Sequence, residues 1–161
     1  MKIQKVTANN RRRCFDVRVS RGILPFPYKR CDPTPSPSDR VADVVVDRDL
    51  GREGFTYRLE SGAEGSVHVD SVLDVNGDPE YLARLELYRL TLEAKARLEA
   101  TGLSIRQASE RLATSPTQLY RLLDPTNYTK SARQLLAVLA LGGATVTVSD
   151  ATKSTTGKIP A

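Results

Sequence analysis

The hydrophobic pattern of this chain changes its period at the segment NGDP (76–79). Before this segment, apolar residues alternate with polar ones, as in strands whose side chains point to opposite faces of a sheet. After it, apolar residues recur every three or four positions, as in helices that bury one face. Turn residues followed by proline are typical of a helix start. The sequence therefore predicts an α+β protein with a small antiparallel β-rich domain at 1–78, a helical domain at 79–150 and a flexible tail at 151–161.

Strand-like alternation rich in Val, Tyr and Phe occurs in five segments of the N-terminal half: 2–8, 14–19, 41–47, 55–60 and 66–73. Together they predict a small, mostly antiparallel sheet. Between them, CDPTPSPSD (31–39) has proline at every second position of its centre, which removes backbone donors and excludes a helix. We expect a loop or an edge extension there, and a hairpin loop at 60–66.

The C-terminal half opens with a long helical pattern over 80–100, predicting one amphipathic helix or two short ones in line. Its apolar positions are Leu82, Leu85, Tyr88, Leu92 and Ala96. Gly102 lies where a C-cap glycine is expected, and Ser104 with Gln107 forms a capping-box pattern at the start of the next helix.

Two short helices follow, with a tight joint near Thr114. Pro116 is tolerated only in the first turn of a helix, so the second helix should begin near Ser115. Apolar residues are spaced to close a small core between the two helices: Ile105, Ala108, Leu112, Leu119 and Leu122. The remaining face of the second helix carries Ser115, Thr117, Gln118, Tyr120 and Arg121.

This polar face suits contact with DNA. In a helix-turn-helix the second helix lies in the major groove and presents its first side chains to base edges. Gln118 can pair with adenine and Arg121 can reach guanine or a phosphate, while Ser115 and Thr117 can bond to phosphates or bases. Two other interpretations remain open: Tyr120 as a partly buried packing residue, and the pair of helices as an ordinary αα-hairpin with a polar exterior.

Charge is distributed unevenly along the chain. Residues 1–38 hold nine Lys and Arg against two Asp and Glu (+7), residues 39–80 hold four against eleven (−7), and residues 81–161 hold eleven against six (+5). Such asymmetry indicates that one part of a chain faces an acidic partner. The C-terminal half is therefore where a polyanion is expected.

The segment LSIRQASERLATSPTQLYRLLDPTNYTKSARQLLAVLALGG (103–143) resembles the DNA-binding domain of the Cro/lambda-repressor-like (XRE) helix-turn-helix family, particularly its antitoxin-like branch. With the flanking helix and tail, the resemblance covers about 80–148. At the positions that mark the family stand Ser109 inside the first helix, Ala113 at the turn, and Thr114 and Ser115 before the recognition helix. Because the family has glycine where Ala113 stands, we expect a left-handed conformation there, at a cost of roughly 1 kcal/mol or more.

This resemblance implies a bacterial, cytoplasmic, sequence-specific transcriptional regulator that binds double-stranded DNA as a homodimer, with a toxin or another protein as a further partner. It implies phosphate contacts in the loop after the recognition helix, from Thr126, Asn127, Tyr128, Lys130 and Ser131. Arg106 of the first helix completes the expected DNA-binding set. The family also implies that ATVTVS (144–149) forms a short strand that packs on the domain or pairs across a dimer.

The sequence predicts no enzyme, cofactor or metal site. His68 and Asp70 share one face of a predicted strand, but no serine, cysteine or metal ligand accompanies them, so we expect an exposed pair without chemistry. Cys14 and Cys31 lack metal-ligand spacing and are expected to be buried or idle thiols.

Membrane and secretion signals are not expected either. No apolar run approaches the ~18 to 20 residues needed to cross a bilayer, and the basic N-terminus is followed by no apolar signal region. A cytoplasmic protein without a membrane partner is predicted. The alternative to DNA binding is a protein-interaction or small-ligand module whose acidic N-terminal face is the working surface and whose helices only mediate dimerisation.

Overall fold

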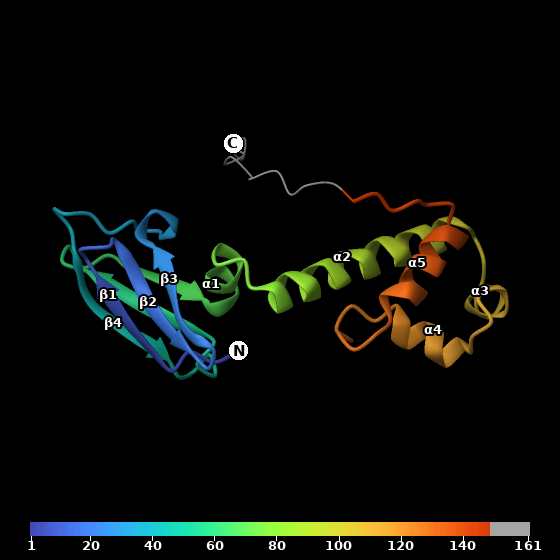
Figure 1. Cartoon of the computed structure of the whole chain (residues 1–161), viewed down its shortest axis with the longest axis horizontal. Coiled ribbons are helices and arrows are strands. Elements are labelled where there is room, and N and C mark those ends of the chain that lie inside the picture. The colour runs from blue at the N-terminus through green and yellow to red at the C-terminus, as the bar shows by residue number, and fades with distance from the viewer. Residues whose placement is uncertain (149–161) are drawn as a thin grey trace. The chain divides into compact units, whose positions relative to one another are not determined.

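The computed structural model describes residues 1–148 and divides after Ala83 into two compact units, the first being Met1–Ala83 and the second beginning at Arg84 (Figure 1). We call them unit 1 and unit 2. Strands lie in unit 1 and most helices in unit 2, so the expected α+β class is confirmed. The tail expected at 151–161 lies outside the described residues.

Unit 1 contains two three-stranded antiparallel sheets instead of the single sheet expected (Figure 1). The first has the order β1-β2-β3, with β1 (Lys5–Asn9), β2 (Cys14–Val19) and β3 (Gly22–Pro27). The second has the order β4-β5-β6, with β4 (Val41–Asp47), β5 (Gly54–Leu59) and β6 (Glu64–His68). A 3-10 turn η1 (Tyr28–Arg30) and a helix α1 (Val69–Val75) complete the unit.

Two elements of unit 1 differ from the sequence prediction. Strand β3 is not among the predicted strands. It contains Pro25 and Pro27, and it lies at the edge of its sheet, where missing backbone donors are tolerated. The strand expected at 66–73 is wrong after His68, where α1 begins. Val69, Val72 and Leu73 are buried at helical spacing, so burial in the core selects the helix over the alternation of valines.

The core of unit 1 is centred on Phe15 of β2. Its ring centroid lies 4.9 Å from that of Tyr28, 5.0 Å from that of Phe55 and 5.1 Å from that of Tyr57. Phe55 and Tyr57 belong to β5, so this cluster joins the two sheets. Edge-to-face and tilted arrangements of this kind add to the stability supplied by apolar burial.

The proline-rich segment 31–39 is a loop that is held against the second sheet. The Tyr57 hydroxyl donates a hydrogen bond to the carbonyl oxygen of Pro33 at 2.6 Å. A Cβ added at Gly65 would lie 2.3 Å from that hydroxyl oxygen and 2.5 Å from the carbonyl oxygen of Asp32. Only glycine therefore allows the loop and β6 to approach so closely.

Both cysteines are buried free thiols, as expected. Desolvation by burial raises the pKa of Cys31 to about 11, and it also raises the pKa of Cys14. Because the thiolate is the reactive form, neither thiol is activated at neutral pH.

Unit 2 is built from α3 (Ile105–Arg111), α4 (Pro116–Leu122), α5 (Ala132–Leu141) and the greater part of α2 (Pro79–Ala100) (Figure 1). The pattern at 80–100 forms one continuous helix, but its buried face is not the expected one. Thr91, Ala94 and Leu98 are buried, whereas Leu82, Tyr88 and Leu92 are exposed. Leucines occur on both sides of α2, so spacing alone could not identify the side that packs.

The short strand expected at 144–149 is not formed over its described part, 144–148. Val146 and Val148 are exposed, and Val148 is 98% accessible. A strand is stabilised by hydrogen bonds to a neighbouring strand, and unit 2 contains no strand among its described residues. Residue 149 lies outside the described part.

Candidate nucleic-acid interface

Helices α3 and α4 are joined by a turn whose ends are fixed by caps. The Ser104 hydroxyl accepts a hydrogen bond from the Gln107 backbone N–H at 3.3 Å, and Gln107 Oε1 accepts from the Ser104 N–H at 2.9 Å. At α4, Ser115 is the N-cap and accepts from the Gln118 N–H at 3.2 Å, with Pro116 in the first turn. The capping box and the helix start at Pro116 are confirmed.

Ala113 lies between the two helices with φ of 50°, the left-handed conformation expected at the turn. A side chain with a Cβ is strained in this region by roughly 1 kcal/mol. The strain is offset by the packing of both helices around the turn, since α3 and α4 contact each other directly. The turn therefore has a fixed geometry.

The face of α4 that points away from the solvent packs into the core of unit 2. Ala108 and Leu119 are fully buried and Leu122 nearly so, while Ile105 and Leu112 are partly buried against them. Helix α5 supplies the other side of this core through Leu135, Val138 and Leu139. These contacts confirm the small core expected between the two helices.

The outward face of α4 carries the polar side chains that were predicted to lie there. Ser115, Thr117, Gln118, Tyr120 and Arg121 are all exposed. Thr117 and Arg121 are four residues apart, on the same side of the helix. Tyr120 is 63% accessible, so it is not the partly buried residue of the alternative interpretation.

Gln118 is less free than its exposure suggests. Its Oε1 accepts a hydrogen bond from the Thr114 hydroxyl at 2.8 Å, which links the turn to α4. Bidentate pairing with adenine uses both the oxygen and the nitrogen of the amide, so it would require this hydrogen bond to break. Arg121 makes no such contact through its side chain within the described residues, so of these two side chains it is the freer one.

The loop after α4 is ordered by its own polar groups. The Asn127 amide nitrogen donates to the carbonyl oxygen of Arg121 at 3.0 Å, and Asn127 Oδ1 accepts from the Thr129 N–H at 3.1 Å. Thr126 donates to Asp124 through its backbone N–H and its hydroxyl, and these hydrogen bonds lower the pKa of the Asp124 carboxyl. Asn127 and Thr126 therefore shape the loop that presents Tyr128, which is exposed.

Lys130 has a structural role that the sequence did not indicate. Its ammonium donates to the hydroxyl of Thr91 at 3.0 Å and also to the carbonyl oxygen of Asp124. Thr91 is fully buried in α2, and burial lowers the pKa of Lys130. Two of the three ammonium donors are used to attach the loop to α2. A phosphate contact through the third donor stays a prediction.

We expect Lys130→Ala to lower the free energy of unfolding by roughly 1–3 kcal/mol, because it leaves a buried hydroxyl and a carbonyl with fewer partners. Urea unfolding followed by circular dichroism measures this loss. Arg133→Ala is the matched control, since Arg133 is exposed on α5 and its removal should change stability by within about 0.5 kcal/mol. Equal unfolding midpoints for both variants would contradict the structural role of Lys130.

The remaining expected DNA-binding residues lie at helix starts or on α3. Ser131 is the N-cap of α5 and accepts a hydrogen bond from the Gln134 N–H at 3.4 Å. Arg106 is exposed on α3 and pairs with Glu110 at 3.2 Å, a surface ion pair of small energy. Arg133, which is not in the expected set, is also exposed, two residues after the Ser131 cap.

Among the described residues no group of three or more His, Cys, Asp or Glu is placed to hold a metal ion. His68 is the last residue of β6 and caps α1, accepting a hydrogen bond from the Asp70 N–H at 3.3 Å, so only Asp70 of this exposed pair lies in the helix instead of the expected strand. Within 1–148, no helix has the length and apolar character that crossing a membrane would require.

Comparisons of this chain with family models, with curated proteins and with solved structures found no match. The expected membership of the XRE family therefore stays a hypothesis. Its support comes from the capped helices, the turn at Ala113 and the exposed face of α4.

Proposed function

We propose that the protein is a cytoplasmic, sequence-specific DNA-binding regulator of transcription, of the antitoxin-like helix-turn-helix type, with α4 as its recognition helix. The observation that carries this proposal is the division of α4 into a buried side with Leu119 and Leu122 and an exposed side with Thr117 and Arg121. One such helix reads only a few base pairs, so the proposed regulator binds a two-part site as a homodimer.

The charge around α4 supports a polyanionic partner. Residues 103–143 contain Arg106, Arg111, Arg121, Lys130 and Arg133 against only Glu110 and Asp124. Glu110 is paired with Arg106, and Asp124 lies in the loop held by Lys130. Cations that neutralise phosphates release counterions from the duplex and supply much of the affinity for DNA.

Within the proposed interface, the residues divide into two roles. Arg121 can form a bidentate contact with guanine, and Thr117 can bond to a base or a phosphate. Phosphate contacts are assigned to Arg106, Tyr128, Ser131 and Arg133, which are exposed on α3, in the loop and at the start of α5. Because its oxygen is bonded to Thr114, Gln118 has a secondary role as a donor through its amide nitrogen.

Selection of binding sites from random DNA tests this proposal. The wild-type chain should enrich one motif, and Arg121→Ala should relax it at one base position by roughly 1–3 kcal/mol of discrimination. The Arg121 side chain and that of the control, Arg89, are both exposed, so removing either should leave folding almost unchanged. Arg89→Ala is the matched control, because Arg89 is an exposed arginine of α2 paired with Glu86 at 2.6 Å.

Two outcomes would reject the recognition role of α4. The first is that the wild type enriches no motif, in which case a protein-interaction or small-ligand module with helices for dimerisation is the better explanation. The second is that Arg121→Ala and Arg89→Ala select the same motif with the same stringency as the wild type. Circular dichroism of each variant verifies that a change in selection does not come from unfolding.

A further inference from the structure

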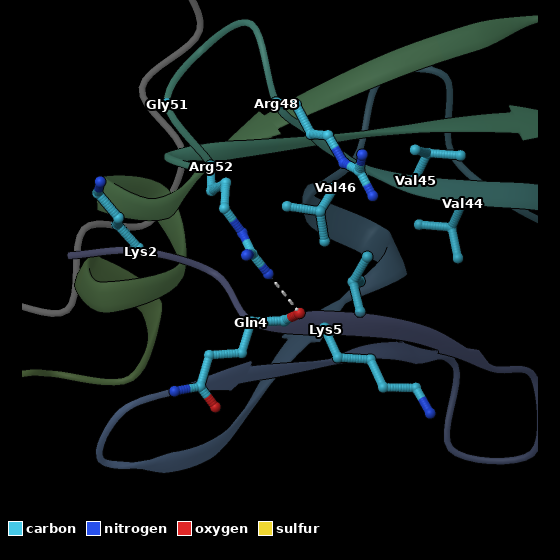
Figure 2. A pocket seen from close by; sticks show the side chains of 10 residues that line it. Lys2, Gln4, Lys5, Val44, Val45, Val46, Arg48, Gly51 and Arg52 are labelled. Atoms are coloured by element: carbon cyan, nitrogen blue, oxygen red, sulfur yellow. Dashed lines mark hydrogen bonds between the residues drawn. The ribbon is translucent and has the colours of Figure 1, made fainter.

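Unit 1 contains a groove of about 710 Å³ between the first and the second sheet (Figure 2). From β1 and the residue before it, Gln4, Lys5 and Val6 line one side. From β4, Val44, Val45 and Val46 line the other. In a strand, successive side chains point to opposite faces, so three successive residues meet one groove only when the groove follows the edge of the strand. The groove therefore runs along two strand edges.

Both strands are the outermost members of their sheets. Strand β1 pairs only with β2 and β4 only with β5, so within residues 1–148 neither has a hydrogen-bonded strand on its groove side. An exposed edge of this kind is a template for the backbone of another extended segment. Val45 is 56% accessible, so the sheet face beside this edge is open to solvent.

The opposite side of the groove is partly closed by Arg52. The Ile3 N–H donates to the carbonyl oxygen of Arg52 at 2.7 Å, and Arg52 Nε donates to the carbonyl oxygen of Ile3 at 3.1 Å. The guanidinium also donates to the carbonyl oxygen of Gln4 at 2.9 Å, as Figure 2 shows. These hydrogen bonds occupy the backbone of the two residues that precede β1.

The charge of the groove selects the kind of partner. Lys2, Lys5, Arg48 and Arg52 line it, and no Asp or Glu does so among the described residues. No described residue forms an ion pair with any of these four cations. Among the described residues that line the groove none is aromatic, so these residues provide no stacking surface of the kind on which single-stranded nucleic acids are held. Cations beside valines fit a peptide that alternates carboxylates with apolar side chains.

We propose that this groove binds an extended acidic segment of a partner protein, which adds to the edge of β4 as a further strand. Its backbone pairs with β4, its carboxylates lie beside Lys5 and Arg48, and its apolar side chains pack on the valines. The end of this chain is a poor occupant, because its residues 149–161 carry Lys153 and Lys158 against Asp150. The role belongs to unit 1 and is separate from the DNA binding proposed for unit 2.

The test begins with selection from a library of short random peptides on the immobilised full-length chain. We expect enriched peptides to alternate Asp or Glu with β-branched residues. A fluorescein-labelled enriched peptide should bind Arg48→Glu at least about tenfold more weakly than the wild type, because like charges then face each other. Lys29→Glu is the matched control, since Lys29 is an exposed cation of unit 1 outside the lining of the groove. The affinity of this variant for the peptide should equal that of the wild type.

Methylation of the peptide backbone tests the pairing itself. In an added strand, alternate N–H groups point toward β4, so methylating that set should abolish binding, whereas methylating the other set should not. Equal binding of both methylated peptides would overturn strand addition. An absent or non-acidic consensus, or equal effects of Arg48→Glu and Lys29→Glu, would overturn the groove as the site. Tighter binding of single-stranded DNA, lost on Arg48→Glu, would assign the groove to a nucleic acid and overturn the proposal.

Discussion

Replacement of Leu119 by alanine is expected to lower the free energy of unfolding of unit 2 by about 2–5 kcal/mol. Leu119 lies on the inward side of α4 and is fully buried, in a cluster with Ala108, Leu135 and Val138. The substitution removes apolar contact and leaves a cavity that the surrounding helices can fill only in part. Urea unfolding followed by the far-ultraviolet circular dichroism signal of the helices measures the loss.

Tyr120→Ala is the control for this experiment, because Tyr120 is the next residue of α4 but is exposed. Removing its ring should change stability by within about 0.5 kcal/mol. If the two variants unfold at the same urea concentration, the assignment of buried and exposed sides to α4 is wrong, and the proposed recognition face is lost with it.

Local chemistry made the joint between α3 and α4 predictable. A serine cap bonds to a backbone N–H three residues on, and a proline fits only the first helical turn, so Ser104, Ser115 and Pro116 define helix starts whatever lies around them. The left-handed turn at Ala113 followed from resemblance to a helix-turn-helix pattern. Burial of Leu119 and exposure of Arg121 then followed from helical spacing.

Other features depended on contacts between residues distant in the sequence. The buried side of α2 is selected by α5 and the other helices, and the two sets of leucines along α2 have similar spacing. Helix α1 replaces a strand because Val72 and Leu73 enter the core of unit 1. By sequence, Lys130 is expected to be a surface cation. Its contact with Thr91 depends on the packing of α2 beside the loop. Periodicity contains no information about these partners.

The two sheets of unit 1 could not be distinguished from one sheet by sequence. Alternation predicts strands and their inward residues but does not say which strands are hydrogen-bonded and which only pack face to face. Phe15, Phe55 and Tyr57 are inward residues of two different sheets, and their ring contacts join those sheets. The groove beside β1 and β4 exists because the strands at these two edges are not joined by a ladder of hydrogen bonds.

Phe15→Ala is expected to destabilise unit 1 by about 3–5 kcal/mol, because it removes a fully buried ring that contacts aromatic rings of both η1 and β5. Hydrogen exchange of the β2 and β5 amides, measured by NMR on the full chain, reports the loss in this unit alone. Val45→Ala is the control, since Val45 is largely exposed and should change protection by within about 0.5 kcal/mol. Similar protection of the β5 amides in both variants would mean that Phe15 does not hold the second sheet to the first, and the groove between their edges would then lack the rigid walls on which strand addition to β4 depends.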